Sequence, residues 1–175
     1  SYRLLEQVYE AYLPMSEGRA LLKQESGMKE SEREAFLDSF KENGTQTLVA
    51  FCVLGGIFGE GIDLKEEQLI GAVIVGTGLP QIGNEREILK NYYEEKSGNG
   101  FDYAYRYPGM NKVLQAAGRV IRTGSDRGVI VLLDERFLES SYKNLFPREW
   151  SDYQICSVEH VADAVEAFWN NCEVH

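Results

Sequence analysis

The chain has 175 residues, of which 43% are hydrophobic and 26% charged, and this composition favours a soluble globular domain over a disordered segment. Its 28 acidic and 18 basic side chains give a formal net charge of −10. That charge excludes nucleic-acid binding through bulk positive charge, so any such contact must be local, made by a few basic side chains and backbone N–H groups.

Helical spacing of apolar residues predicts helices at 2–12, 31–42, 84–107 (two helices around a break at 97–100), 111–122 and 158–169. Apolar runs predict strands at 19–24, 47–54, 70–75 and 129–133. Strands that alternate with helices predict an α/β fold, in which a parallel sheet is flanked by helices on both faces. Ligands of such a sheet bind beyond the carboxyl ends of its strands.

The cysteines and the chain start suggest where the protein works. Cys52, Cys156 and Cys172 form no C-x-x-C pair, so they support neither a disulfide framework nor a zinc site. No leader opens the chain, and no apolar run approaches the ~18 residues of a membrane-spanning helix. We therefore expect a cytoplasmic protein with no membrane partner. A start at Ser1 rather than Met indicates a fragment of a longer protein, although processing also removes a first methionine.

The segment 111–122 carries the strongest chemical signal. At about 100° per residue, Gln115, Arg119 and Arg122 would share one narrow face of the predicted helix. Gly118 would lie beside them and permit a close approach of backbone or phosphate. Guanidinium groups neutralise and orient phosphoryl oxygens, which favours a phosphate-binding face. The alternative for two arginines alone is a solvated helix face.

The order of several motifs resembles one family. Q-x-x-G-R-x-x-R at 115–122 resembles motif VI of superfamily 2 helicases, and GGIFGEGIDL at 55–64 resembles motif V. Ser1 and Tyr2 look like the end of motif IV, while GLP at 78–80, YRYP at 105–108 and DERF at 134–137 match the XPD/DinG branch. From Ser1 to about Phe146 the chain is therefore similar to the helicase C-terminal (second RecA-like) motor lobe, with the first strand missing. We expect residues 1–175 to form this one domain.

The resemblance implies roles for individual residues. Arg119 and Arg122, with Gln115, would act as arginine fingers on the γ-phosphate of ATP. The nucleotide-side residues would be Glu60, Gly61, Asp63 and Gly118, with Glu60 linking the ATP site to DNA. The last strand would be tied to the arginine helix by Asp134 and Arg136.

The nucleic-acid side is predicted from loops and from an aromatic segment. Single-stranded DNA would contact Ser1, Tyr2, Gly56 and Gly78, largely through backbone groups. The aromatic segment 92–107 has two interpretations: a base-stacking platform, or rings that pack this part of the domain. Glu94 and Glu95 weigh against the platform, because carboxylates repel phosphates.

The sequence also lacks two motifs that ATP hydrolysis requires. Neither a G-x-x-x-x-G-K-[ST] loop nor a D-E-A-H box occurs. The resemblance implies that ATP and Mg²⁺ are bound mainly by the N-terminal lobe of the same protein, which becomes the first partner. The iron–sulfur ligands of the family lie in that lobe, so this sequence does not decide whether the full-length protein holds such a cluster. No metal site is expected here.

The resulting hypothesis is an ATP-dependent DNA helicase that moves 5′ to 3′ on single-stranded DNA, with a place in DNA repair. The alternative from another class is a degenerate lobe that acts as a protein-interaction module, which the acidic charge favours and the aligned arginines disfavour. A free-standing nucleotide-binding domain is disfavoured by the missing phosphate-binding loop.

Overall fold

The computed structural model describes residues 1–41, 46–55, 69–124 and 126–172. The chain divides into two compact units, Ser1–Phe137 and Leu138–His175, and each is described by itself. All of the strands in the described residues belong to the first unit, and they pair in parallel. The expected α/β class with parallel strand pairing is therefore confirmed.

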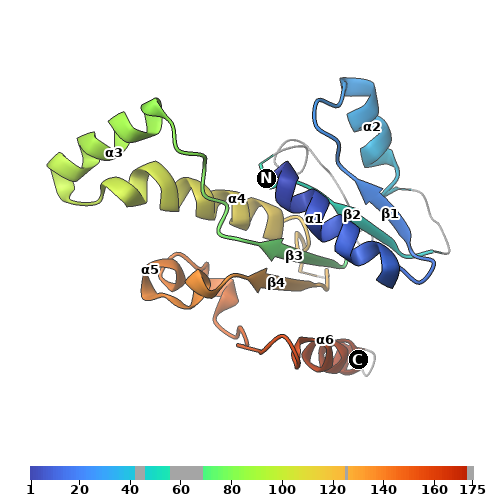
Figure 1. The fold of residues 1–175 in the computed structure, drawn as a ribbon. Coiled ribbons are helices and arrows are strands. Elements are labelled where there is room, and N and C mark those ends of the chain that lie inside the picture. Colours follow the sequence, from blue (N-terminus) through green and yellow to red (C-terminus); the bar gives the residue numbers. More distant parts are fainter. Residues whose placement is uncertain (42–45, 56–68, 125, 173–175) are drawn as a thin grey trace. The chain divides into compact units, whose positions relative to one another are not determined.

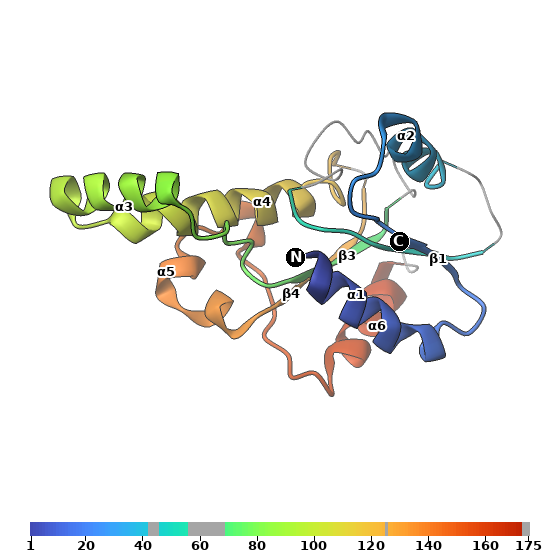
Figure 2. The same cartoon turned by 45° about the horizontal axis from the view of Figure 1, so that its top comes forward.

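The first strand pair has a helix on each face. β1 (Ala20–Lys23) and β2 (Leu48–Phe51) run parallel, with Ala20 opposite Leu48. α1 (Tyr2–Tyr12) packs Tyr9 and Tyr12 on Phe51, at ring-centroid distances of 5.3 and 5.5 Å. Figure 2 shows α1 and α2 (Glu30–Asp38) on opposite sides of β1.

α2 and the turn that follows it cover the other face with aromatic side chains. Phe36 and Phe40 are 3% and 9% exposed, and they contact each other at 5.9 Å between ring centroids. The partly buried residues packed against them are Leu22, Met28, Leu37, Leu48, Ala50, Cys52 and Leu69. Because successive strand residues point to opposite faces, Leu48 and Ala50 face α2 while Phe51 faces α1. This pair thus has the predicted helix–sheet–helix layering.

The second strand pair joins β3 (Gly71–Val75) to β4 (Val129–Leu133), with Val75 opposite Leu133. Ile74 is 4% exposed, whereas its neighbours Val73 and Val75 are 65% and 38% exposed. α4 (Tyr107–Ala117) contacts β3 and buries Val113 completely. The core of this pair therefore lies on the side of Ile74.

α3 (Asn84–Ser97) and α4 form an elongated helix pair (Figure 1). α3 ends at Gly98, whose φ of +68° is a left-handed cap that glycine adopts without strain. A π-helical turn, Asp102–Arg106, leads into α4. Tyr105 donates its hydroxyl proton to Glu87 (2.5 Å), and Arg86 donates to the Ala104 carbonyl (3.2 Å), so this turn is fixed to α3.

The second unit contains α5 (Ser140–Lys143) and α6 (Val161–Cys172), with a 3-10 turn at Arg148–Trp150 between them. Phe146 contacts the rings of Trp150 and Tyr153 at 5.3 and 5.6 Å. In the described part of the chain, no helix combines the length and the apolar character needed to cross a bilayer.

Candidate functional site

The predicted arginine helix is shorter than the sequence indicates. α4 ends at Ala117, and the N–H groups of Arg119 and Val120 bond to the carbonyls of Ala116 and Ala117, three residues back (3.2 and 3.0 Å). The prediction of one helix through Arg122 is therefore wrong. Gln115 lies on the last turn of the helix, and the two arginines lie in the turns that follow it.

A single carboxylate fixes the turn that follows the helix. Asp126 accepts the backbone N–H of Arg122 (2.9 Å), and the N–H and hydroxyl of Thr123 (2.8 and 2.7 Å). These bonds take N–H groups that a continuing helix would direct to carbonyls four residues back. The hydroxyl and N–H of Thr123, followed by the N–H of Arg122, lower the pKa of Asp126 below its ordinary value. The carboxylate therefore stays ionised at neutral pH.

The buried side chain of Val120 anchors the same segment to the β3–β4 core. Val120 is 2% exposed, and a Cβ atom placed on Gly128 would lie 2.4 Å from its Cγ1 atom. Gly128 has room for this contact only because it has no side chain. Arg119 and Arg122 flank the anchored residue and are each partly buried. Gln115 and Gly118 are exposed beside them. The structure thus keeps the four predicted residues in one segment, although they do not share a helical face.

The first residue of the glycine-rich loop (residues 55–64), Gly55, lies beside α4. Gly55 has a φ of +80°, and a Cβ atom placed on it would lie 3.1 Å from Cε of Lys112. Lys112 precedes Gln115 by about one turn of α4. The residues that follow β2 therefore come close to the helix that carries Gln115. Lys112 was not predicted, although its spacing of three residues from Gln115 is a helical-neighbour signal. The predicted Gly56, Glu60, Gly61 and Asp63 lie outside the described residues.

Ser1 and Tyr2 lie close to the strand that precedes the glycine-rich loop. The Ser1 hydroxyl accepts the Leu4 N–H (3.4 Å) and caps α1. The Tyr2 hydroxyl accepts a hydrogen bond from Nε2 of Gln24 (3.0 Å), and Oε1 of Gln24 accepts the N–H of Val53 (2.9 Å). Gln24 is 4% exposed and was missed by the sequence analysis.

Gly78 makes a backbone contact with the start of α4. Gly76 and Gly78 have φ values of +85° and +67°. A Cβ atom placed on Gly78 would lie 2.6 Å from the Gly109 carbonyl oxygen, and one placed on Gly109 would lie 2.6 Å from the Thr77 carbonyl oxygen. Thr77 is 1% exposed, and its hydroxyl has no hydrogen-bond partner among the residues that the structure describes. This contact sets the β3 loop against α4, and the predicted DNA contact of Gly78 stays a prediction.

The aromatic rings of segment 92–107 pack mainly on one another. Tyr93 and Tyr103 are stacked, with centroids 4.1 Å apart and planes 11° from parallel. Tyr92 meets Tyr93 edge-on at 5.2 Å, and Tyr107 meets Tyr103 edge-on at 5.2 Å. Rings that stack on each other have fewer open faces for bases, so this arrangement favours the packing interpretation.

Asp134 and Arg136 form an ion pair at the carboxyl end of β4. Arg136 donates from Nε to Oδ1 (2.8 Å) and from Nη2 to Oδ2 (2.7 Å), and its backbone N–H also bonds to Oδ1 (3.0 Å). This pairing with Arg136 holds the pKa of Asp134 below its ordinary value. The two residues are thus fixed to each other, while their predicted tie to the arginine segment stays a prediction.

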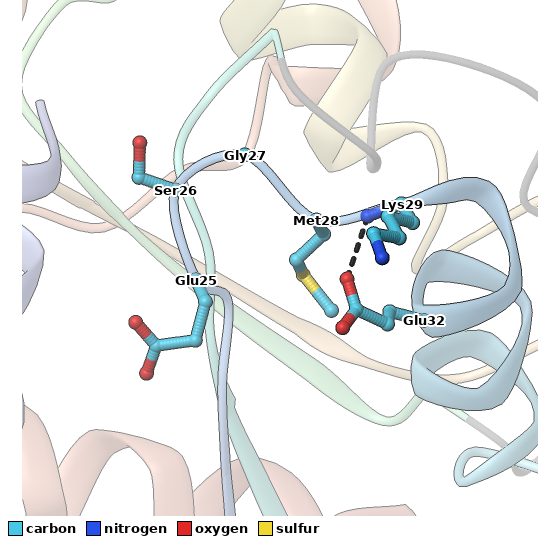
Figure 3. A pocket seen from close by; sticks show the side chains of 6 residues that line it. All are labelled: Glu25, Ser26, Gly27, Met28, Lys29 and Glu32. Atoms are coloured by element: carbon cyan, nitrogen blue, oxygen red, sulfur yellow. Dashed lines mark hydrogen bonds between the residues drawn. The ribbon is translucent and has the colours of Figure 1, made fainter.

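A hollow of about 400 Å³ opens where the chain passes from β1 to α2 (Figure 3). The residues that line it are Glu25, Ser26, Gly27, Met28, Lys29 and Glu32. The Glu32 carboxylate already accepts the Lys29 N–H (2.6 Å), so it occupies a donor that a phosphate would need. Two carboxylates against one lysine make the hollow unsuitable for an anion. Among the described residues, no group of three His, Cys, Asp or Glu side chains is placed to hold a metal ion.

Comparisons with known proteins place these features in a family. The model of the helicase C-terminal domain matches residues 1–153. The regulator of telomere elongation helicase 1 homolog of Caenorhabditis elegans is 30% identical over 128 residues, which cover 66% of this chain and 12% of that protein. Its Caenorhabditis briggsae counterpart is 33% identical over 110 residues, covering 58% of this chain and 11% of that protein.

A solved structure, described as an XPD helicase, superposes with a TM-score of 0.61 at 22% identity, over 83% of this chain and 25% of that chain. This likeness confirms the RecA-like α/β fold. The chain spans about a tenth of the length of these two nematode relatives.

Proposed function

The chain belongs to the helicase C-terminal domain family, and from this premise we propose that it is the second motor lobe of an ATP-dependent DNA helicase. In this role it supplies arginine side chains to ATP bound between two lobes, and backbone contacts to single-stranded DNA. The N-terminal lobe of the same protein is the required partner. ATP hydrolysis belongs to the complete protein, because this chain has neither a phosphate-binding loop nor a D-E-A-H box.

The observation that carries the proposal is the bracing of the arginine segment. Val120 anchors it to the core, and Asp126 fixes the backbone N–H of Arg122 at 2.9 Å. A guanidinium contributes to phosphoryl transfer only when it is already in position, because charge then develops opposite a fixed donor. A surface arginine on a solvated helix needs neither an anchored neighbour nor a carboxylate that fixes its backbone.

The side chains of the arginine segment suit a nucleoside triphosphate. ATP and Mg²⁺, when bound, supply the γ-phosphoryl group and the metal that neutralises it. Arg119 and Arg122 would hold the γ-phosphate from this lobe, and Gln115 and Gly118 would border it. Glu60, Gly61 and Asp63 are proposed for the nucleotide side of the glycine-rich loop. Lys112 adds a cation at the head of that loop, beside Gly55.

The DNA side is proposed at the amino end of α1 and at two loops. Ser1, Tyr2, Gly56 and Gly78 would meet the backbone of single-stranded DNA. Such local contacts fit a chain with a net charge of −10, because backbone N–H groups bind phosphate without a basic surface. Movement from 5′ to 3′ belongs to the same proposal.

The test is the ATPase activity of the full-length parent with single-stranded DNA, comparing wild type with Arg122→Ala. We expect a loss on the order of 10³-fold in kcat with nucleotide binding retained, as for other arginine fingers. Comparable rates would remove the arginine-finger role. A wild-type parent without ATPase activity would instead favour the protein-interaction module.

A further inference from the structure

Gln24 is a buried polar residue to which the proposed function assigns no part. It follows β1 directly and is 4% exposed. A primary amide has two N–H donors and a carbonyl acceptor, so its burial is costly unless these groups are bonded. The Gln24 amide bonds at both of its ends: Oε1 accepts the Val53 N–H (2.9 Å), and Nε2 donates to the Tyr2 hydroxyl (3.0 Å). The backbone N–H of Gln24 also bonds to the Phe51 carbonyl (2.9 Å).

The bond to Val53 determines how the chain leaves β2. The strand ladder ends at Phe51, opposite Lys23, so the N–H of Val53 lies beyond the paired residues. A buried N–H group needs an acceptor, and the Gln24 side chain provides it. Two residues later the chain reaches Gly55, which lies against Lys112 of α4. The Gln24 amide therefore fixes the backbone two residues before Gly55.

The bond to Tyr2 connects the same amide to a residue that is proposed to contact DNA. Tyr2 is 40% exposed, so its ring is accessible while its hydroxyl is held by Gln24. If DNA displaced Tyr2, the distance between the Tyr2 hydroxyl and the Gln24 amide would change. Because Oε1 of the same amide accepts the Val53 N–H, such a displacement would be transmitted to Val53 and then to Gly55 beside Lys112.

We propose that Gln24 is a positioning residue that couples the DNA end of the lobe, at Tyr2, to Gly55 and to Lys112 of α4. This inference rests on the proposed function, and it adds a residue to it. Gln24 is 4% exposed and would act through the two groups that its side chain binds, the Tyr2 hydroxyl and the Val53 N–H. Its loss lowers the stimulation of ATP hydrolysis by DNA, measured as the ratio of the stimulated rate to the basal rate.

The experiment uses the full-length parent with Gln24→Met, which keeps the side-chain length but has no amide. ATPase rates are measured with and without oligo(dT), together with the thermal melting temperature. Gln7→Met is the matched control, because Gln7 is exposed on α1 and the same change there removes no contact to the loop. We expect Gln24→Met to lower the stimulation ratio about tenfold, as one or two lost buried hydrogen bonds allow. Gln7→Met should keep the wild-type ratio.

A second variant separates coupling from folding. Gln24→Glu keeps an acceptor for the Val53 N–H and offers a carboxylate to which the Tyr2 hydroxyl can donate. It should recover part of the ratio that Gln24→Met loses. The inference is overturned if Gln24→Met matches Gln7→Met, or if its basal and stimulated rates fall together and leave the ratio unchanged.

The two proposals fail in different ways. An unchanged ratio in Gln24→Met, with an inactive Arg122→Ala variant, would reject the role of Gln24 and leave the motor lobe in place. An active Arg122→Ala variant with a reduced ratio in Gln24→Met would reject the arginine finger and support the coupling. A wild-type parent that DNA does not stimulate would overturn both.

Discussion

The carboxylate of Asp126 bonds to the backbone N–H of Arg122 at 2.9 Å, four residues back along the chain. It also holds Thr123 through the N–H and the hydroxyl, so one side chain closes the turn that follows α4. The position of the Arg122 side chain depends on this turn, because its Cα atom lies inside it. A substitution of Asp126 should therefore displace the Arg122 side chain while leaving Arg122 itself in the sequence.

The first prediction concerns Asp126→Ala in the full-length parent. The turn loses three hydrogen bonds, and the DNA-stimulated kcat should fall by as much as ~100-fold, the effect that a misplacement of about 1 Å has at a reacting centre. ATPase kinetics with oligo(dT) measure it. Asp163→Ala, at an exposed position of α6, is the control and should retain the wild-type rate. Equal rates for the two variants would contradict the positioning role.

The second prediction is a loss of stability in acid. Hydrogen bonds from Thr123 and Arg122 lower the pKa of Asp126, and Arg136 lowers that of Asp134, both from an ordinary 3.8. A lowered native pKa means that the stabilising contribution is fully present above about pH 4 and is lost as the pH falls through the native values. Urea unfolding of the chain between roughly pH 5 and pH 2 measures this slope.

The acid slope has its own control. In Asp126→Asn and Asp134→Asn the titrating group is absent, so each variant should show a shallower decline of the unfolding midpoint than wild type over the same interval. A slope identical to wild type in both variants would mean that other carboxylates cause the acid unfolding.

The third prediction concerns the glycine contact between the β3 loop and α4. Gly109→Ala would place a Cβ atom 2.6 Å from the Thr77 carbonyl oxygen. Because that oxygen belongs to the backbone, no change of rotamer can relieve the clash. We expect a loss on the order of 1–3 kcal/mol in the free energy of unfolding. Gly83→Ala is the control, since a Cβ atom there would meet nothing within 4 Å. Equal stabilities in urea unfolding would show that the two backbones separate easily.

The fourth prediction concerns thiol reactivity. Burial raises the pKa of the Cys52 thiol far above its usual range, and Cys52 packs against the Phe36 and Phe40 cluster. Cys156 is exposed. Because the thiolate is the reactive form, iodoacetamide should modify Cys156 at least ~10-fold faster than Cys52 in the folded protein. Peptide mass spectrometry measures both rates, which should converge in urea. Similar rates without urea would place Cys52 in contact with solvent.

The strands and the α1 and α2 helices could be predicted from sequence because their signals are local. The apolar run 47–54 predicts the strand β2, and the two-residue repeat of any strand then places Phe51 on one face and Leu48 and Ala50 on the other. The end of α4 could not be located by the same signal. Helical spacing continues through Arg122, but Asp126 lies beyond the periodic segment and takes the N–H groups that the helix would need. The cluster T-G-S-D was the available warning.

The prediction of the arginine pair rests on a different signal. Arg119 and Arg122 were predicted because their spacing matches a family motif, which a wrong helix boundary does not alter, and their role stays a prediction. Gln24 was missed because a buried glutamine gives no pattern of its own. Its partners, Tyr2 and Val53, are 22 and 29 residues away in sequence, so its part appears only after the strands have paired.

The contact of Gly78 with Gly109 has a consequence for how the domain can diverge. The backbones of Gly78 and Gly109 touch without intervening side chains, so no change of rotamer lets one shift past the other. The start of α4 is therefore held rigidly against the loop that follows β3. The α3 helix lies between Gly78 and Gly109 in the sequence, whereas Arg119 follows Gly109. Insertions or changes in α3 can therefore accumulate while the orientation of the arginines relative to the sheet is preserved.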